Sequence, residues 1–452
     1  MKSHIDSAKE QSSQKLHSQL KVVFHMTKND IPGNQFRGMT DLLRAVGAPD
    51  FGTDDGIHKH SESLCDMERA LEGVIMRQLD EKLKASEFIG IIIDETVSIT
   101  VENKLIVYAK IENKGKIDNF FLGNYNLHSR TAQCIYEKVV EVLRGRGIEL
   151  SKIMGLGLDG ASVMTGKRAG VGALLKRVNP FLIQVHCVTH RAALAAVDAA
   201  NAVSQEDANL GSIRPIVHAS IAGLTQLKDE LGPEEVEFQN DLQDGKYGNV
   251  EVTHLNERSI QAHTNVRSKY IQHLINALQD RFPDDTLDLI SSLDILLNPS
   301  RYPHAQSAFQ EYARDATEMV IAHFGHEVTE SAAAPLIDVK RARRDAVAVM
   351  TALHGYGGLT FATACKVLIC EFSELYPDWA ALAKIACVLP VSSVPAERGF
   401  SLLNRVKTSL RSRLEEERVM RLMRIASCKD TLDTFHFSSA AEDFAAMKAR
   451  RK

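Results

Sequence analysis

The spacing of apolar residues divides the chain into a helical start, an α/β section and a long helical remainder. Within residues 1–84, apolar positions recur at helical spacing, most clearly over residues 71–79. At residue 88 the pattern changes to a continuous apolar run, Phe88–Ile93, which ends abruptly at Asp94. A short run of this kind is typical of a strand that is buried on both faces.

Four further strands are predicted, at residues 105–111, 119–127, 153–158 and 181–185. The Asn-Lys-Gly-Lys sequence between the first two supplies a hairpin turn. Helices are predicted at residues 131–143, 171–178 and 187–200 from their apolar spacing and alanine content. Three strands in a meander, followed by alternating helices and strands, predict an α/β fold with a mixed five-stranded sheet.

The rest of the chain is predicted to be helical. We expect an N-terminal helical region (1–84), the first part of an α/β core (85–200), a helical insertion (201–375) and a C-terminal region that completes the core (376–452). The C-terminal region carries two apolar stripes at helical spacing, which exceed what its two helices can bury on each other. The stripes fit either a homodimer interface, which we expect, or packing on the α/β core. Their residues are Phe400, Leu403, Val406, Leu410, Val419 and Leu422.

The amino-acid composition limits the classes of protein to which the chain can belong. The chain has 452 residues, is 44% hydrophobic and 25% charged, and is therefore globular. Its net charge is −4, yet residues 376–452 hold 14 Lys and Arg against nine Asp and Glu, which suits contact with phosphate. No apolar run reaches the roughly 18 residues that span a bilayer, so no membrane contact is expected. Seven scattered cysteines indicate reduced thiols in an intracellular protein.

Three sequence motifs resemble cofactor or metal sites, but each of them lacks part of the required pattern. Residues 155–160 match G-x-G-x-x-G, but the pattern overlaps a predicted strand and the next acid is Asp198, so no dinucleotide site is expected. Residues 160–167 resemble a P-loop that is one residue too long, with Arg168 at the magnesium-binding position. A zinc site on Cys187 and His190 lacks a second pair of ligands, since Cys365 and Cys370 are distant and badly spaced.

Two carboxylates give stronger evidence for a functional site than these motifs do. Asp94 and Asp159 each follow a buried strand, and the two strands are predicted to be neighbours in the sheet. Adjacent carboxylates repel each other unless a cation neutralises them, and Mg²⁺ prefers oxygen ligands of this kind. A two-metal phosphoryl-transfer centre requires such carboxylates on rigid strands. One acid alone would more often be a solvated loop residue or a helix cap.

Four sequence blocks, at residues 91–96, 157–166, 185–191 and 389–401, resemble the ribonuclease H-like domain and the C-terminal dimerisation region of hAT-superfamily transposases. More specifically, the blocks are similar to the transposon-derived group of the zinc finger protein 862 kind. The resemblance implies a DDE set made of Asp94, Asp159 and Glu397, which would hold Mg²⁺ or Mn²⁺ if the protein is active; otherwise no cofactor is expected. It also implies a C-x-x-H motif, Cys187 and His190, that lies beside the active site and helps to hold DNA.

From the resemblance and the local charge we expect a nuclear protein that contacts DNA or chromatin partners, with further DNA contacts from Arg191, Arg398, Arg405 and Lys407. Active members of the family carry an N-terminal zinc finger, whose Cys/Cys/His/His spacing is absent from residues 1–84. They also use a Trp in the helical insertion, whereas Trp379 lies after it. An aromatic residue such as Tyr270 or Tyr302 could substitute. These departures fit a domesticated or truncated transposase, and they leave open a catalytically inert, dimerising protein-interaction scaffold.

Overall fold

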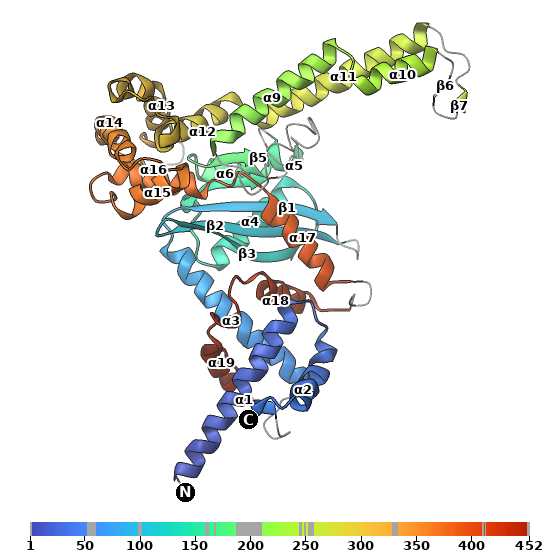
Figure 1. Cartoon of the computed structure of the whole chain (residues 1–452), viewed down its shortest axis with the longest axis vertical. Helices are drawn as coiled ribbons and strands as arrows, with labels where there is room; N and C mark the ends of the chain where they lie inside the picture. Colours follow the sequence, from blue (N-terminus) through green and yellow to red (C-terminus); the bar gives the residue numbers. More distant parts are fainter. Residues whose placement is uncertain are drawn as a thin grey trace. The chain divides into compact units, whose positions relative to one another are not determined.

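In the computed structural model the chain forms two compact units. Figure 1 shows its helices and strands in colours that follow the sequence. Unit 1 comprises Met1–Asn113, Ile117–Lys152 and Pro395–Lys452, and unit 2 comprises Lys114–Lys116 and Ile153–Val394. The structure describes residues 2–51, 60–97, 102–158, 162–166, 169–186, 210–243, 246–247, 250–251, 257–327, 333–408, 411 and 413–449. Among these residues, no helix is both long enough and apolar enough to cross a membrane.

The predicted mixed sheet is confirmed. Its strands are β1 (Ile89–Val97), β2 (Asn103–Asn113), β3 (Lys116–Asn126), β4 (Ile153–Leu158) and β5 (Ile183–His186), in the order β3-β2-β1-β4-β5. Strands β1 and β2 are antiparallel, and β4 and β5 are parallel. The turn between β2 and β3 places Lys114 and Gly115 at φ values of 51° and 76°, the left-handed geometry that a tight hairpin requires.

Strand β1 runs further than its apolar residues suggest. The apolar run stops at Ile93, but Asp94–Val97 continue the ladder by pairing with Asn103–Ile106 of β2. Backbone pairing therefore carries the strand past the point at which its side chains become polar. Asp94 consequently lies within a strand rather than in the loop that follows it.

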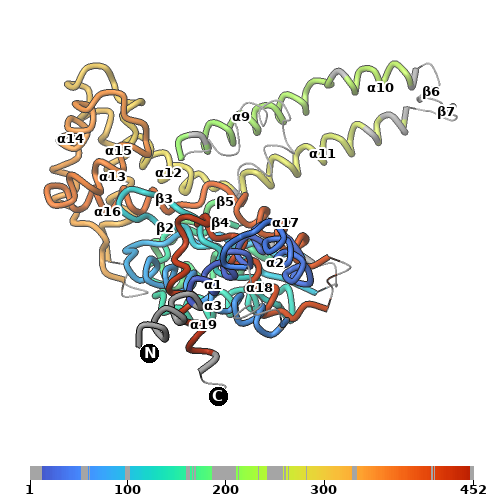
Figure 2. Tube along the Cα trace, turned by 60° about the horizontal axis from the view of Figure 1, so that its bottom comes forward, coloured from blue at the N-terminus to red at the C-terminus, as the bar shows by residue number. Residues whose placement is uncertain are grey.

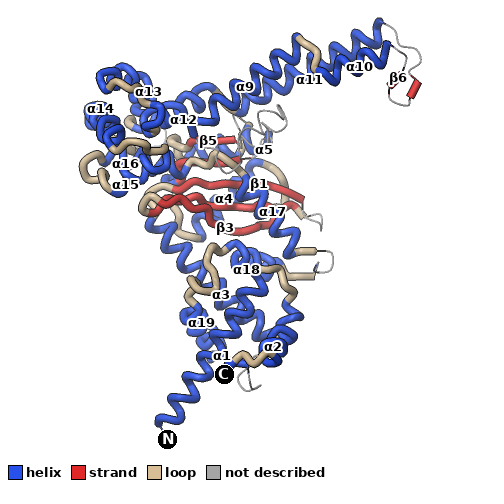
Figure 3. The backbone as a smooth tube through the Cα atoms, viewed as in Figure 1, coloured by secondary structure: helices blue, strands red, loops and turns tan. Residues whose placement is uncertain are grey.

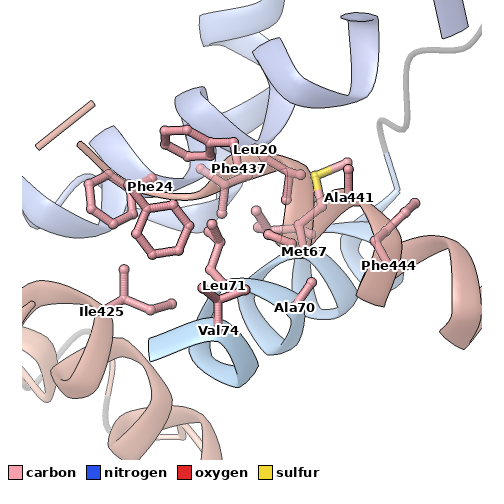
Figure 4. Close-up of a cluster of buried hydrophobic side chains, with 14 of the residues drawn as sticks. Leu20, Phe24, Met67, Ala70, Leu71, Val74, Ile425, Phe437, Ala441 and Phe444 are labelled. Carbon is pink, nitrogen blue, oxygen red and sulfur yellow. The ribbon is translucent and has the colours of Figure 1, made fainter. Parts of the chain in front are cut away.

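Unit 1 also contains seven helices among the described residues: α1 (Lys2–Lys28), α2 (Phe36–Ala45), α3 (Ser61–Ala85), α4 (Ala132–Gly145), α17 (Val394–Val406), α18 (Glu416–Ser427) and α19 (Phe437–Ala449). Helices from the two ends of the chain share one hydrophobic core (Figure 4). Leu20 and Phe24 of α1 and Leu71 of α3 are buried with Ile425 of α18 and Phe437 of α19. The N-terminal and C-terminal helices therefore stabilise one another.

Unit 2 is mostly helical beyond the sheet (Figure 3). The helices α9 (Leu210–Asp229) and α11 (Glu257–Arg281) pack side by side as a long hairpin, which Figure 2 shows in a second view. Among the described residues, the other α-helices and strands of unit 2 are α5 (Ser162–Thr165), α6 (Val171–Val178), α10 (Pro233–Gln243), β6 (Lys246–Tyr247), β7 (Val250–Glu251), α12 (Asp284–Leu297), α13 (Phe309–Phe324), α14 (Val339–Gly355), α15 (Phe361–Cys370) and α16 (Pro377–Val388).

Candidate functional site

The first candidate acid, Asp94, lies on the face of β1 that helix α17 covers. Ile92, two residues earlier on the strand, is 1% exposed in a cluster that includes Ala396 and Leu403 of α17. Side chains two residues apart on a strand point to the same face. Asp94 therefore shares this face with Ile92, and its side chain is half-buried there.

The second candidate acid, Glu397, lies in the first turn of α17 and is also half-buried. Two residues later, Gly399 brings the helix backbone against β2: a Cβ atom at this position would lie 3.1 Å from Ile106 Cδ1 and 3.1 Å from the Tyr108 ring. Ile106 is the register partner of Asp94. Glu397 therefore comes from the helix that covers the Asp94 face, at a helix end whose dipole favours a carboxylate.

The neighbouring acid, Glu95, lies on the opposite face of β1. It accepts hydrogen bonds from Nε and Nη2 of Arg130, at 3.1 and 2.6 Å. Its other oxygen, Oε2, is buried without a hydrogen-bond partner in the part of the chain that the structure describes. Glu95 is thus paired with Arg130 on the face of β1 opposite to Asp94.

Several predicted site residues lie outside the described residues: Asp159, Cys187, His190, Arg191 and Leu410. Strand β4 is described up to Leu158, the residue before Asp159. Within the described ranges, no three His, Cys, Asp or Glu side chains cluster in a way that could hold a metal. The structure therefore brings Asp94 and Glu397 to one face and does not describe the third acid.

The basic side chains of the C-terminal helices were expected to contact phosphate, but several of them are paired within unit 1. Arg405 Nε lies 2.8 Å from Asp30 Oδ2 at the end of α1. Arg418 forms a two-point contact with Glu68 of α3, at 2.7 and 3.0 Å, and Arg424 contacts Glu72 at 2.6 Å. Part of the positive charge of these helices is therefore neutralised by Asp30, Glu68 and Glu72 of the N-terminal region.

Lys407, one of the predicted DNA contacts, is buried. Its side chain is 7% exposed, and its Nζ lies 3.2 Å from Glu102 and 2.9 Å from Glu416. Burial works against its charge, yet the hydrogen bonds that Lys407 donates to these two carboxylates raise the pKa of Lys407. Arg398 differs from Lys407, because it is exposed on α17. Burial raises the pKa of Tyr108 to about 12, and the positive charge of Arg398 acts against this shift.

The apolar stripes also lie mainly inside unit 1. Leu403, Val406 and Val419 are at most 3% exposed, in a cluster with Ile92, Ile106 and Phe121 of the sheet. Phe400 and Leu422 are partly buried against the same cluster. These helices have more apolar surface than they can bury on each other, as expected, but the sheet of the same chain covers most of it.

Unit 1 contains a cavity of about 390 Å³ that the sequence patterns did not indicate. It lies between the end of α1, the start of α3 and the α17–α18 segment, and its apolar lining includes Val23, Ile31, Leu64, Val406, Leu414 and Leu422. The lining residues come from three separated stretches of sequence. For this reason no local motif could have identified the cavity.

The rejected motifs have structural explanations. A Cβ atom on Gly155 would lie 2.6 Å from Pro390 Cδ and 3.1 Å from Val388 O, so this glycine permits close packing of the segment after α16 on β4. Cys365 is buried in contact with Cys387, which together with burial raises the pKa of its thiol, whereas Cys370 is exposed. A buried thiol whose pKa is raised in this way is a poor zinc ligand.

The aromatic candidates of the helical insertion differ in exposure. Tyr270 of α11 is 65% exposed. Tyr302 is buried, and its hydroxyl donates to the Leu296 carbonyl oxygen. Trp379 is buried as well and donates from Nε1 to Ala342 O at 3.1 Å, so its role is to attach α16 to α14. Of these three, only Tyr270 presents its ring to solvent.

Comparison with known protein families agrees with this arrangement. Residues 61–170 match the family model described as "ZMYM1/FAM200, RNase-like domain". Residues 364–427 match the hAT family C-terminal dimerisation region. Together the two matches support an hAT-type, transposase-derived protein. The dimerisation region supports a homodimer.

Proposed function

We propose that this transposase-derived homodimer retains a divalent-metal site for cleavage and transfer of DNA strands, made of Asp94, Asp159 and Glu397. The observation that carries the proposal is the packing of α17 on β2. Gly399 lies against Ile106, the partner of Asp94, so the helix that carries Glu397 covers the Asp94 face. Residues that lie roughly 300 positions apart in the chain are thereby brought to one side of the sheet.

The donor chemistry fits Mg²⁺ or Mn²⁺. Asp94 and Glu397 offer carboxylate oxygens, the ligands that these hard cations prefer, and both side chains are half-buried. Asp159 would supply the third carboxylate. When bound, the metal would polarise the phosphate and activate the attacking oxygen. The chain's own contribution is to hold the acids on a strand and on a helix that is packed tightly against the sheet.

Because the proposed substrate is DNA, we expect the protein to be nuclear. The proposal also includes the more specific resemblance to the zinc finger protein 862 group. Arg398, exposed one residue after Glu397, is the described basic side chain best placed to meet a phosphate at this site. Cys187, His190 and Arg191 remain candidate DNA contacts on the strength of their C-x-x-H motif. Arg405 and Lys407 have roles within the fold, because both are ion-paired.

The proposal is tested by nicking of supercoiled plasmid DNA in the presence of Mn²⁺. We expect the wild-type protein to nick the plasmid, and we expect Asp159→Asn and the chelated wild-type protein not to do so. The variant must stay folded and dimeric, which circular dichroism and light scattering establish. Equal nicking by the wild type and Asp159→Asn would indicate a contaminating nuclease and would contradict the proposal.

A catalytically inert dimerising scaffold is the second candidate, and the ion pairs favour it. Arg418 and Arg424 are neutralised by Glu68 and Glu72, so the C-terminal helices offer less positive charge to DNA than their sequence suggests. A protein that dimerises without nicking DNA, and whose three acids bind no metal, would have this function.

A further inference from the structure

The matched dimerisation region, residues 364–427, buries most of its apolar side chains inside its own chain. Every residue of helix α16 from Asp378 to Val388 except Lys384 is buried. Leu403, Val406 and Val419 of α17 and α18 are buried against the sheet. A second copy must therefore bind elsewhere on this region.

One apolar surface of the described part of the region remains open, at the turn between α15 and α16. Leu375 is 62% exposed there, and Cys370 is exposed as well. Phe372 and Tyr376 are half-buried beside Leu375, with ring centroids 5.9 Å apart. Tyr356, 47% exposed at the end of α14, packs edge-on against Phe372 at 6.1 Å. The α15–α16 corner comprises these residues: Tyr356, Cys370, Phe372, Leu375 and Tyr376.

The α15–α16 corner is held rigidly from beneath. Asp378 pairs with Arg341 of α14, with Oδ1 at 2.8 Å from Nη2, and Trp379 donates to Ala342 O of the same helix. The Tyr356 hydroxyl donates to Glu371 Oε2 at 2.6 Å. Rings that are fixed in this way lose little conformational entropy on binding, and aromatic side chains are enriched at the centres of interfaces.

We propose that the α15–α16 corner is the homodimer interface, where the corners of two copies pack on each other across a two-fold axis. The inference rests on the dimerisation in the proposed function and names the surface that carries it. A two-fold interface uses the same patch twice, so the patch must complement itself. Protruding side chains such as Leu375 and Tyr356 can interdigitate with their own copies. The cavity in unit 1 is concave, and two concave surfaces that meet across a two-fold axis cannot fill each other.

Light scattering on the full chain tests the surface with three matched Leu→Asp variants. The wild type should have a mass of about 100 kDa, twice the 50.0 kDa chain. Leu375→Asp should be monomeric at micromolar concentration with an unchanged melting temperature. Leu432→Asp, at an exposed position in unit 1, should remain dimeric. Leu414→Asp at the cavity should not dissociate the dimer either.

Chemical cross-linking gives a readout that does not depend on a disruptive substitution. Because Cys370 is exposed at the corner, a short bis-maleimide should join two wild-type chains, and Cys370→Ser should lose most of that product. A dimer that survives Leu375→Asp, or that dissociates with Leu414→Asp instead, would overturn this surface but leave dimerisation intact. A monomeric wild type would contradict the dimer in the proposed function itself.

Discussion

Gly399 of α17 lies against Ile106 of β2, and only a residue without a side chain fits this contact comfortably. A Cβ atom at Gly399 would lie 3.1 Å from Ile106 Cδ1, closer than ordinary van der Waals contact. Ile106 pairs with Asp94 across the ladder, and Glu397 precedes Gly399 by two residues. This contact therefore links the packing of the C-terminal helix to the position of the candidate acids.

Replacing Gly399 with valine should push α17 away from the sheet. Overpacking of this kind costs about 1–3 kcal/mol, and we expect the free energy of unfolding to fall by that amount. The control is Gly145→Ala in α4, where an added Cβ meets no atom within 4 Å. That change should be neutral or should add up to about 1 kcal/mol through helix propensity. Denaturant unfolding that shows Gly399→Val as stable as Gly145→Ala would contradict the close contact.

Leu403→Asp should destabilise unit 1 rather than produce a folded monomer. Leu403 is 2% exposed among Ile92, Ile106 and Met423, so a carboxylate there would be buried without a partner. We expect a loss of about 3–5 kcal/mol, from the lost apolar contacts and the buried polar group. Asn404→Asp is the matched control, because Asn404 is exposed on the same helix. If a thermal melt showed Leu403→Asp to be folded like the wild type but monomeric, the stripe would form the dimer interface after all.

The contact of Lys104 with Glu416 should make the protein sensitive to acid. Lys104 is fully buried, and its Nζ lies 2.5 Å from Glu416 Oε2 and 3.1 Å from Glu102. Burial opposes the charge on Glu416, but hydrogen bonds from Lys104 and Lys407 outweigh it and lower the pKa of Glu416. Because the pKa is lower in the folded state, the stabilisation is present above the unfolded pKa of about 4.3 and is lost as the pH falls through the folded pKa.

Unfolding measured between neutral pH and pH of about 3 should show this loss in the wild type and a smaller one in Glu416→Gln. Lys104→Met should cost about 1–2 kcal/mol at neutral pH, less than a fully buried pair, because Glu416 and Glu102 are 39% and 42% exposed. Identical pH profiles for the wild type and Glu416→Gln would show that this cluster does not set the acid sensitivity.

The strands could be predicted from the sequence, because a buried strand leaves a continuous apolar run. The apolar run stops before Asp94, although backbone pairing continues β1 to Val97. The partners of the C-terminal helices could not be predicted. Periodicity shows that Leu403 and Val419 lie on apolar faces, but it does not show which element covers them. Likewise, the basic side chain of Arg418 is evident in the sequence, whereas its partner Glu68 lies 350 residues away. Contacts of this range become visible only when the two ends of the chain are seen in one core.

Titration of the full chain with Mn²⁺, followed by electron paramagnetic resonance of the free ion, tests the metal site most directly. The wild type should bind Mn²⁺, and Asp94→Asn and Glu397→Gln should each lose most of the affinity, because each removes one carboxylate ligand. Glu95→Gln is the matched control: it also removes one carboxylate from β1, but from the opposite face of the sheet, and it should bind Mn²⁺ like the wild type. Equal binding by all four proteins, or by none of them, would contradict a metal site built from Asp94, Asp159 and Glu397.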